Sequence, residues 1–93
     1  HLNTMERCTL KIVNVKGLHA RASAKLVEVV EGFDASATVS KDGMSASGDS
    51  IMGLLMLAAP LGSFIDVETS GSDAVALMQA IKALLADKFG EGA

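Results

Sequence analysis

The chain has 93 residues, of which 49% are hydrophobic and 20% charged, with a single proline. This composition excludes intrinsic disorder and predicts one compact domain. Eleven acidic against eight basic residues give a net charge of −3, and aromatic residues make up 3%, so neither a basic surface nor a stacking platform for nucleic acid is expected.

Cysteine usage and the N-terminal segment indicate where the protein works. Cys8 is the single cysteine, so it cannot close an intramolecular disulfide, and it lacks the partners of a structural zinc site. No segment has the pattern of a signal peptide or the length of a membrane span, which favours a cytoplasmic protein without membrane insertion. Because Met5 follows four residues that begin with His1, we expect residues 1–4 to be a leftover of expression and residues 5–93 to form the domain.

The first predicted elements are a strand and a helix. Alternation of apolar and polar side chains, with several β-branched residues, predicts a strand over residues 8–15. Apolar positions at helical spacing predict a helix over residues 20–31. Gly32 follows at the position that a C-terminal capping glycine takes.

A hairpin and a short helix are predicted next. Residues 35–40 alternate again, and the turn dipeptide Asp42-Gly43 joins them to residues 44–47, which indicates a β-hairpin. Ser50 is placed to cap a helix over residues 51–59, which ends at the proline.

This short helix is apolar on every side, and a domain of this size cannot bury a short helix completely. Two interpretations stay open. The exposed apolar residues can be scattered and without a role, as is common on protein surfaces. Alternatively they form a contact patch, in which the flexible thioethers of Met52 and Met56 adapt to more than one partner.

The last two elements are a strand over residues 64–69 and a helix of about four turns, whose apolar stripe begins at Ala74 and extends toward Phe89. The element order is therefore βαββαβα. Because strands and helices interleave and the strands alternate, we predict an α+β fold. It is a two-layer sandwich with an antiparallel sheet, covered by helices on one face and wet on the other.

His19 is the histidine of the folded part, and it lies in the segment Gly17-Leu18-His19-Ala20-Arg21 between the first strand and the first helix. Unpaired backbone N–H groups and the positive end of the helix dipole meet there, which favours an anion and disfavours a protonated ring by about 0.3–1 kcal/mol. Arg21 could bind phosphate oxygens with its planar fork. The residues alone favour a plainer alternative, in which His19 decorates a helix start and Arg21 is a solvated charge.

Other kinds of chemistry find little support. In the folded part of the chain no second histidine and no cysteine or carboxylate cluster accompanies His19, so neither a metal site nor a Ser–His–Asp triad is expected, and no cofactor is implied. Ser50 has two interpretations. As an N-cap it stabilises the helix by about 1 kcal/mol relative to alanine. As a modification site it would gain about 1.5 to 2 negative charges beside Ile51 and Met52 while the fold stays intact.

The segments Gly17-Leu18-His19-Ala20-Arg21 and Ser50-Ile51-Met52-Gly53-Leu54 together resemble the two signatures of HPr, the histidine-containing phosphocarrier family of the phosphoenolpyruvate:sugar phosphotransferase system. The resemblance extends from about Met5 to Phe89. It implies an open-faced sandwich with antiparallel strand order 1-4-2-3 and three helices on one face. Ala22 departs from the family, which usually has proline there, and alanine should loosen the helix start only slightly.

The resemblance also implies a function. His19 would accept a phosphoryl group on Nδ1 from enzyme I, charged by phosphoenolpyruvate, and pass it to an enzyme IIA component while Arg21 steadies the phosphate. The protein would be a monomeric, stoichiometric carrier rather than an enzyme. Ser50 would be the regulatory serine that HPr kinase/phosphorylase modifies. The implied docking face for these partners consists of Ala20, Ala24, Ile51, Met52, Leu55 and Met56.

A second hypothesis is an acyl carrier protein with phosphopantetheine on Ser50, because Asp49-Ser50-Ile51 is similar to the Asp-Ser-Leu of that family. Acyl carriers are all-helical, so the predicted strands weigh against it. A metallochaperone on a similar small sandwich is disfavoured because the chain has no CxxC pair.

Overall fold

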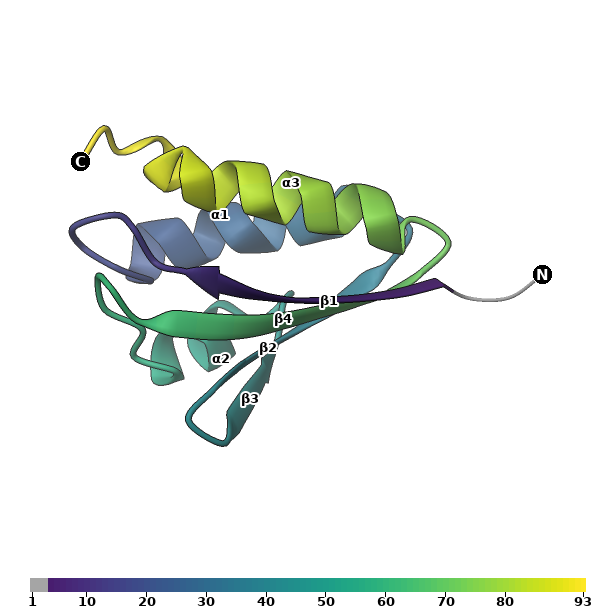
Figure 1. The fold of residues 1–93 in the computed structure, drawn as a ribbon, viewed down its shortest axis with the longest axis horizontal. Helices are drawn as coiled ribbons and strands as arrows, with labels where there is room; N and C mark the ends of the chain where they lie inside the picture. Colours follow the sequence, from purple (N-terminus) through teal and green to yellow (C-terminus); the bar gives the residue numbers. More distant parts are fainter. Residues whose placement is uncertain (1–3) are drawn as a thin grey trace.

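The computed structural model describes residues 4–93. Residues 1–3, which include His1 and most of the predicted leftover of expression, lie outside the described residues, and Thr4 is the first residue of β1. The predicted order of elements is confirmed (Figure 1). It runs β1 (Thr4–Lys11), α1 (Ala20–Glu31), β2 (Ser36–Lys41), β3 (Met44–Ser47), α2 (Ile51–Met56), β4 (Phe64–Gly71) and α3 (Ala74–Ala86), followed by a 3₁₀ turn, η1 (Lys88–Gly90).

The strands form one antiparallel sheet in the order β1-β4-β2-β3, as the resemblance implies. Val67 of β4 lies opposite Cys8 on one side and opposite Val39 on the other. The β2–β3 hairpin turns at Asp42 and Gly43, whose φ angles of 52° and 81° are both positive. Positive φ at both central residues suits the right-handed twist of a hairpin, so the predicted turn dipeptide does what its residue types favour.

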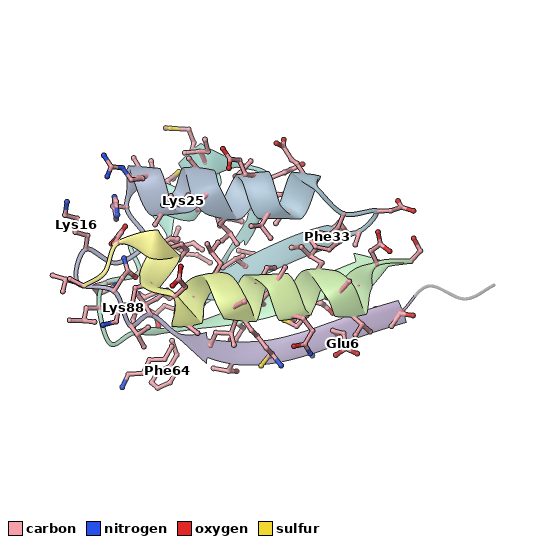
Figure 2. All side chains as sticks on the ribbon, turned by 90° about the horizontal axis from the view of Figure 1, so that it is seen from above. Glu6, Lys16, Lys25, Phe33, Phe64 and Lys88 are labelled. Carbon is pink, nitrogen blue, oxygen red and sulfur yellow. The ribbon has the colours of Figure 1, made fainter. Side chains whose placement is uncertain are left out.

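The helices cover one face of the sheet. In Figure 1 the sheet lies in front of α1 and α2, and Figure 2 shows α1 and α3 side by side above it. The buried residues between the layers include Ile12, Leu26, Val30, Val39, Leu54, Ile65, Val67, Leu77, Ile81 and Phe89. On the other face Thr9 donates to Asp66 at 2.6 Å and Arg7 to Glu68 at 2.9 Å. The predicted α+β sandwich with one wet face is therefore confirmed.

β1 lies earlier in the chain than the predicted residues 8–15. The chain leaves the sheet after Lys11 because its partner strand β4 begins only at Phe64. Ile12 still exchanges hydrogen bonds of 2.8 Å with Ser63 and Gly62, but the residues after it have no ladder partner. The β-branched run therefore continues as a loop.

α2 is shorter than the predicted residues 51–59. It ends at Met56 because Ala58 adopts a φ of 51°, which the right-handed helix cannot accommodate. Leu57 and Ala59 nevertheless remain buried, and the Ala59 carbonyl accepts the backbone N–H of Leu18 at 2.9 Å.

The other helices end differently from one another. α1 has its predicted bounds, but Gly32 caps it with a φ of −80°, in the right-handed region rather than the left-handed one that a capping glycine usually takes. The apolar stripe of α3 is confirmed. Phe89 is 1% exposed, yet it belongs to η1 beyond the end of α3, with a φ of 55°.

The strands also bear on the alternatives. An acyl carrier is all-helical, so the sheet contradicts that hypothesis. Within the part of the chain that the structure describes, the helices are too short to pass through a lipid bilayer.

Candidate functional site

The loop between β1 and α1 is fixed against the segment that precedes β4. Gly17 has a φ of 68°, and a Cβ atom there would lie 2.5 Å from the Ala59 carbonyl oxygen and 2.9 Å from Cα of Pro60. A side chain at this position would therefore strain the backbone and collide with it. Leu18 next to it is 4% exposed and anchors the loop in the core. The residue that follows this anchored pair is His19.

His19 is the N-cap residue of α1. Its backbone is extended, and its side chain makes no capping hydrogen bond. The first hydrogen bond of the helix runs from the Ser23 N–H to the His19 carbonyl at 2.8 Å, so the N–H groups of the three residues between them have no acceptor within the helix. The His19 side chain is 28% exposed. The imidazole is therefore reachable beside the amide-rich helix start, as the sequence predicts.

A carboxylate from the C-terminal tail contacts this imidazole. Oε2 of Glu91 lies within hydrogen-bonding distance of Nε2 of His19. Oε1 of the same carboxylate accepts a hydrogen bond from Nδ2 of Asn14 at 3.0 Å, and that amide also donates to the Gly17 carbonyl at 2.8 Å. Asn14 is fully buried. It therefore ties the tail to the loop that presents His19.

The sequence pattern does not predict this contact of His19 with a single carboxylate. Glu91 lies 72 residues further along the chain, flanked by two glycines, and no local pattern relates it to His19. Asn14 does leave a trace in the sequence, since it is a polar residue within a β-branched run. Among residues 4–93, the histidine, cysteine and acidic side chains form no group of three that could hold a metal ion.

The surroundings of Glu91 favour its ionised form. The hydrogen bond from Asn14 has the largest effect, and together with the His19 contact it holds the pKa of the Glu91 carboxyl below its ordinary value of 4.5. Partial burial opposes this shift, while the positive charge of Lys16 adds to it. Glu91 is therefore a carboxylate at neutral pH, and it can only accept hydrogen bonds.

His19 and Arg21 line the same hollow, which has a volume of about 350 Å³. Its other lining residues are Val15, Lys16, Lys25, Gly90, Glu91 and Ala93. Figure 2 shows Lys16 and Lys25 toward the end of the molecule opposite Glu6. The basic side chains of Lys16, Arg21 and Lys25 thus outweigh the carboxylate of Glu91, which favours an incoming anion.

Ser50 caps α2 as predicted. Its Oγ accepts the backbone N–H of Gly53 at 3.0 Å. The neighbouring Asp49 accepts a hydrogen bond from the Ser47 hydroxyl at 2.5 Å. Ser50 is not among the residues that line the hollow beside His19.

The residues predicted to form a docking face are exposed to different degrees. Ile51, Met52 and Met56 have exposed fractions of 40%, 69% and 66%. Ala20 at the start of α1 is also exposed, whereas Ala24 and Leu55 are half-buried. Since α2 packs beside α1, these residues lie on two neighbouring helices.

Comparisons with known proteins agree with one another. A family model described as the PTS HPr component phosphorylation site matches residues 6–87. Phosphocarrier protein HPr of Cupriavidus necator is 47% identical over 81 residues, which cover 87% of this chain and 91% of that protein. Phosphocarrier protein NPr of Shewanella violacea is 44% identical over 80 residues, or 86% of this chain and 88% of that protein.

Solved structures show the same likeness. The crystal structure of HPr-C-His from Thermoanaerobacter tengcongensis has a TM-score of 0.88 at 32% identity and covers 92% of this chain and 97% of that one. The HPr dimer from the same organism has a TM-score of 0.74 at 33% identity and covers 90% of this chain and 97% of that one.

Proposed function

This chain belongs to the HPr family of phosphocarrier proteins, and from that membership we propose that it accepts a phosphoryl group on His19 from enzyme I and passes it to an enzyme IIA component. The observation that carries the proposal is the position of His19. Its imidazole is partly exposed at the start of α1, in a hollow that it shares with Arg21 and two lysines.

In the proposed transfer, the lone pair on Nδ1 of His19 attacks the phosphorus atom of the donor. A nitrogen–phosphorus bond forms while the bond from phosphorus to the donor atom breaks, and its electron pair stays with the donor. The exposed residue Arg21 lines the same hollow, and its guanidinium attracts the phosphoryl oxygens. Transfer to the acceptor follows the same steps in the opposite sense. A single arginine stabilises the phosphorylated state less than several ligands would, so the phosphoryl group can still leave.

Regulation and docking form a second part of the proposal. We propose that Ser50 is the site of a regulatory phosphorylation and that Ala20, Ala24, Ile51, Met52, Leu55 and Met56 contact the partner enzymes. The exposure of Ile51, Met52 and Met56 supports this, since large apolar side chains in water favour contact with a partner. A phosphate on Ser50 would place charge at the edge of that surface.

We also propose that the protein works as a cytoplasmic monomer and as a stoichiometric carrier rather than an enzyme. One similar solved structure is described as an HPr dimer, so the oligomeric state needs its own measurement. Sedimentation of the protein at its cellular concentration would measure it, and a stable dimer would contradict the monomer.

The test of the carrier function is incubation with phosphoenolpyruvate and enzyme I. We expect acid-labile phosphate on Nδ1 of the wild-type His19, mapped by NMR, and none on His19→Ala, with circular dichroism showing an unchanged fold. Phosphorylation of His19→Ala to the wild-type level would overturn the assignment.

A further inference from the structure

The C-terminal tail is built onto the site by several separate contacts. The Phe89 ring is 1% exposed, and the Phe89 carbonyl accepts a hydrogen bond from Nζ of Lys25 at 2.6 Å. Beyond Glu91, the Ala93 carbonyl accepts the Val15 N–H at 3.2 Å. Gly90 and Gly92 both have a φ of 76°, so the backbone turns on each side of Glu91 and delivers its side chain to His19.

From this arrangement we propose that Glu91 and Asn14 are positioning residues for His19: the Glu91 carboxylate holds the ring in the tautomer that leaves Nδ1 unprotonated, and the Asn14 amide holds the carboxylate. The proposal rests on phosphoryl transfer at His19. It assigns a role in that transfer to two residues outside the signature segments, of which Glu91 lies 72 positions from His19.

The tautomer follows from the hydrogen-bonding capacity of the groups. A carboxylate only accepts, so a hydrogen bond between Glu91 and Nε2 requires the proton to be on Nε2. The lone pair then lies on Nδ1, the nitrogen that the proposed reaction uses. Asn14 keeps this carboxylate from rotating freely, because its Nδ2 donates a hydrogen bond to Oε1 of Glu91.

The carboxylate also has an electrostatic effect on the product. When Nδ1 binds phosphorus while Nε2 keeps its proton, the ring carries a positive charge, and a carboxylate against Nε2 stabilises that charge, as in other carboxylate–histidine pairs. Repulsion between Glu91 and the phosphoryl oxygens opposes this. Two features reduce the repulsion: Glu91 contacts the nitrogen that does not react, and Lys16, Arg21 and Lys25 line the hollow.

The experiment uses two substitutions of Glu91 with different predicted effects. In Glu91→Gln, the Asn14 amide still requires an acceptor, so it holds the Gln oxygen and turns the Gln NH₂ group toward His19. Nε2 must then accept, which moves the proton to Nδ1 and blocks the nucleophile. Glu91→Ala removes the partner without imposing the wrong tautomer. The isosteric variant should therefore be the slower one.

The readouts are the ¹⁵N shifts of the His19 ring in protein labelled on histidine, at about pH 8 where imidazoles are generally neutral, and the rate of phosphoryl transfer from phosphorylated enzyme I. We expect the Nε2–H tautomer in the wild type, Nδ1–H in Glu91→Gln, and a mixture in Glu91→Ala. The transfer rate should fall about 10- to 100-fold in Glu91→Gln, by analogy with the loss of hydrogen-bond partners of metal-binding histidines, and less in Glu91→Ala.

Controls separate this role from a merely structural one. Glu6→Gln removes a partly exposed carboxylate at the opposite end of the molecule (Figure 2) and should change neither readout. Wild-type tautomer and rate in Glu91→Gln, or a slower Glu91→Ala than Glu91→Gln, would overturn the proposal. If wild-type His19 takes no phosphate, the proposed carrier function is wrong. The ¹⁵N shifts of the His19 ring still test whether Glu91 sets its tautomer.

Asn14 is tested by Asn14→Ala in the Glu91→Gln background. Without the Asn14 donor the Gln amide is free to rotate, so the forced Nδ1–H tautomer should relax to a mixture, and persistence of the forced tautomer would contradict the role of Asn14. Because Asn14 also binds the Gly17 carbonyl, melting of the variant is measured first. If the variant unfolds, the tautomers and rates of the two Glu91 variants decide the proposal.

Discussion

The proposed phosphate site around His19 combines neutral, acidic and basic side chains. Arg21 is exposed at the start of α1 and lines the hollow, whereas Glu91 lies against the ring. An exposed charge at a helix start contributes little to folding. Substitution of Arg21 should therefore change the rate of phosphoryl transfer with little effect on the free energy of unfolding, whereas substitution of Glu91 should change both.

Arg21→Ala should lower the rate of phosphoryl transfer by about tenfold or more, because a charge-assisted hydrogen bond to phosphate is lost. The free energy of unfolding should change by no more than about 0.5 kcal/mol. Arg7→Ala is the matched control, since Arg7 is an exposed arginine on the open face of the sheet. A loss of stability as large as the loss of rate would speak against a site role for Arg21.

Glu91 predicts a dependence of stability on pH. Its pKa is lower in the folded protein than its ordinary value of 4.5, so the unfolded chain binds more protons in that range, and the ionised carboxylate stabilises the fold at neutral pH. This contribution should be lost as the pH falls below 4.5. Melting temperatures of wild type and Glu91→Gln should therefore converge toward acid; a constant difference at every pH would contradict the ionised contact.

At the scale of elements, α2 combines a capped start with an exposed apolar surface. The helix is short, so its formation depends on the Ser50 cap and on the burial of Leu54 rather than on helix propensity. The exposed side chains of Met52 and Met56 contribute little to this packing. Capping and docking can therefore be changed independently at Ser50.

Two substitutions at Ser50 separate these roles. Ser50→Ala should cost about 1 kcal/mol of stability through loss of the bond to Gly53 and should leave the affinity for enzyme I nearly unchanged. Ser50→Asp keeps an N-capping side chain, so its stability should be close to that of the wild type, while its charge weakens enzyme I binding by about tenfold. Calorimetry of both variants tests this. Equal affinities of Ser50→Asp and the wild type for enzyme I would show that Ser50 acts only as a helix cap.

At the scale of the whole molecule, the core and the site share a residue. Phe89 fills the space between the layers and at the same time anchors the tail that carries Glu91. A domain of this size has a stability of only about 5–15 kcal/mol. Loss of a large buried ring should therefore affect folding and chemistry together.

Phe89→Ala should lower the free energy of unfolding by about 3–5 kcal/mol because it leaves a cavity. In the fraction that stays folded, the ¹⁵N shifts of His19 should approach those of Glu91→Ala. Phe64→Ala is the matched control: Phe64 is 58% exposed, and its contact with Lys11 is worth about 0.5–1 kcal/mol. Similar losses in both variants would show that Phe89 is not an anchor.

Local patterns in the sequence were sufficient for most of the fold. The bounds of α1, the turn at Asp42 and Gly43, the cap at Ser50 and the stripe of α3 agree with the structure. Each depends on residues within a few positions of one another, because helical spacing, turn conformations and N-caps are short-range properties. The position of His19 beside the start of α1 belongs to the same class of feature.

Tertiary structure decided where β1 ends and what surrounds His19. The end of β1 depends on where β4 begins to offer a partner, and α2 ends where Ala58 takes a positive φ between the buried residues Leu57 and Ala59. The contact of His19 with Glu91 joins residues 72 positions apart through a buried amide. The sequence by itself thus determined most of the elements and the position of His19 at a helix start. The partners of His19 arise only when packing brings distant segments together, which no short-range spacing encodes.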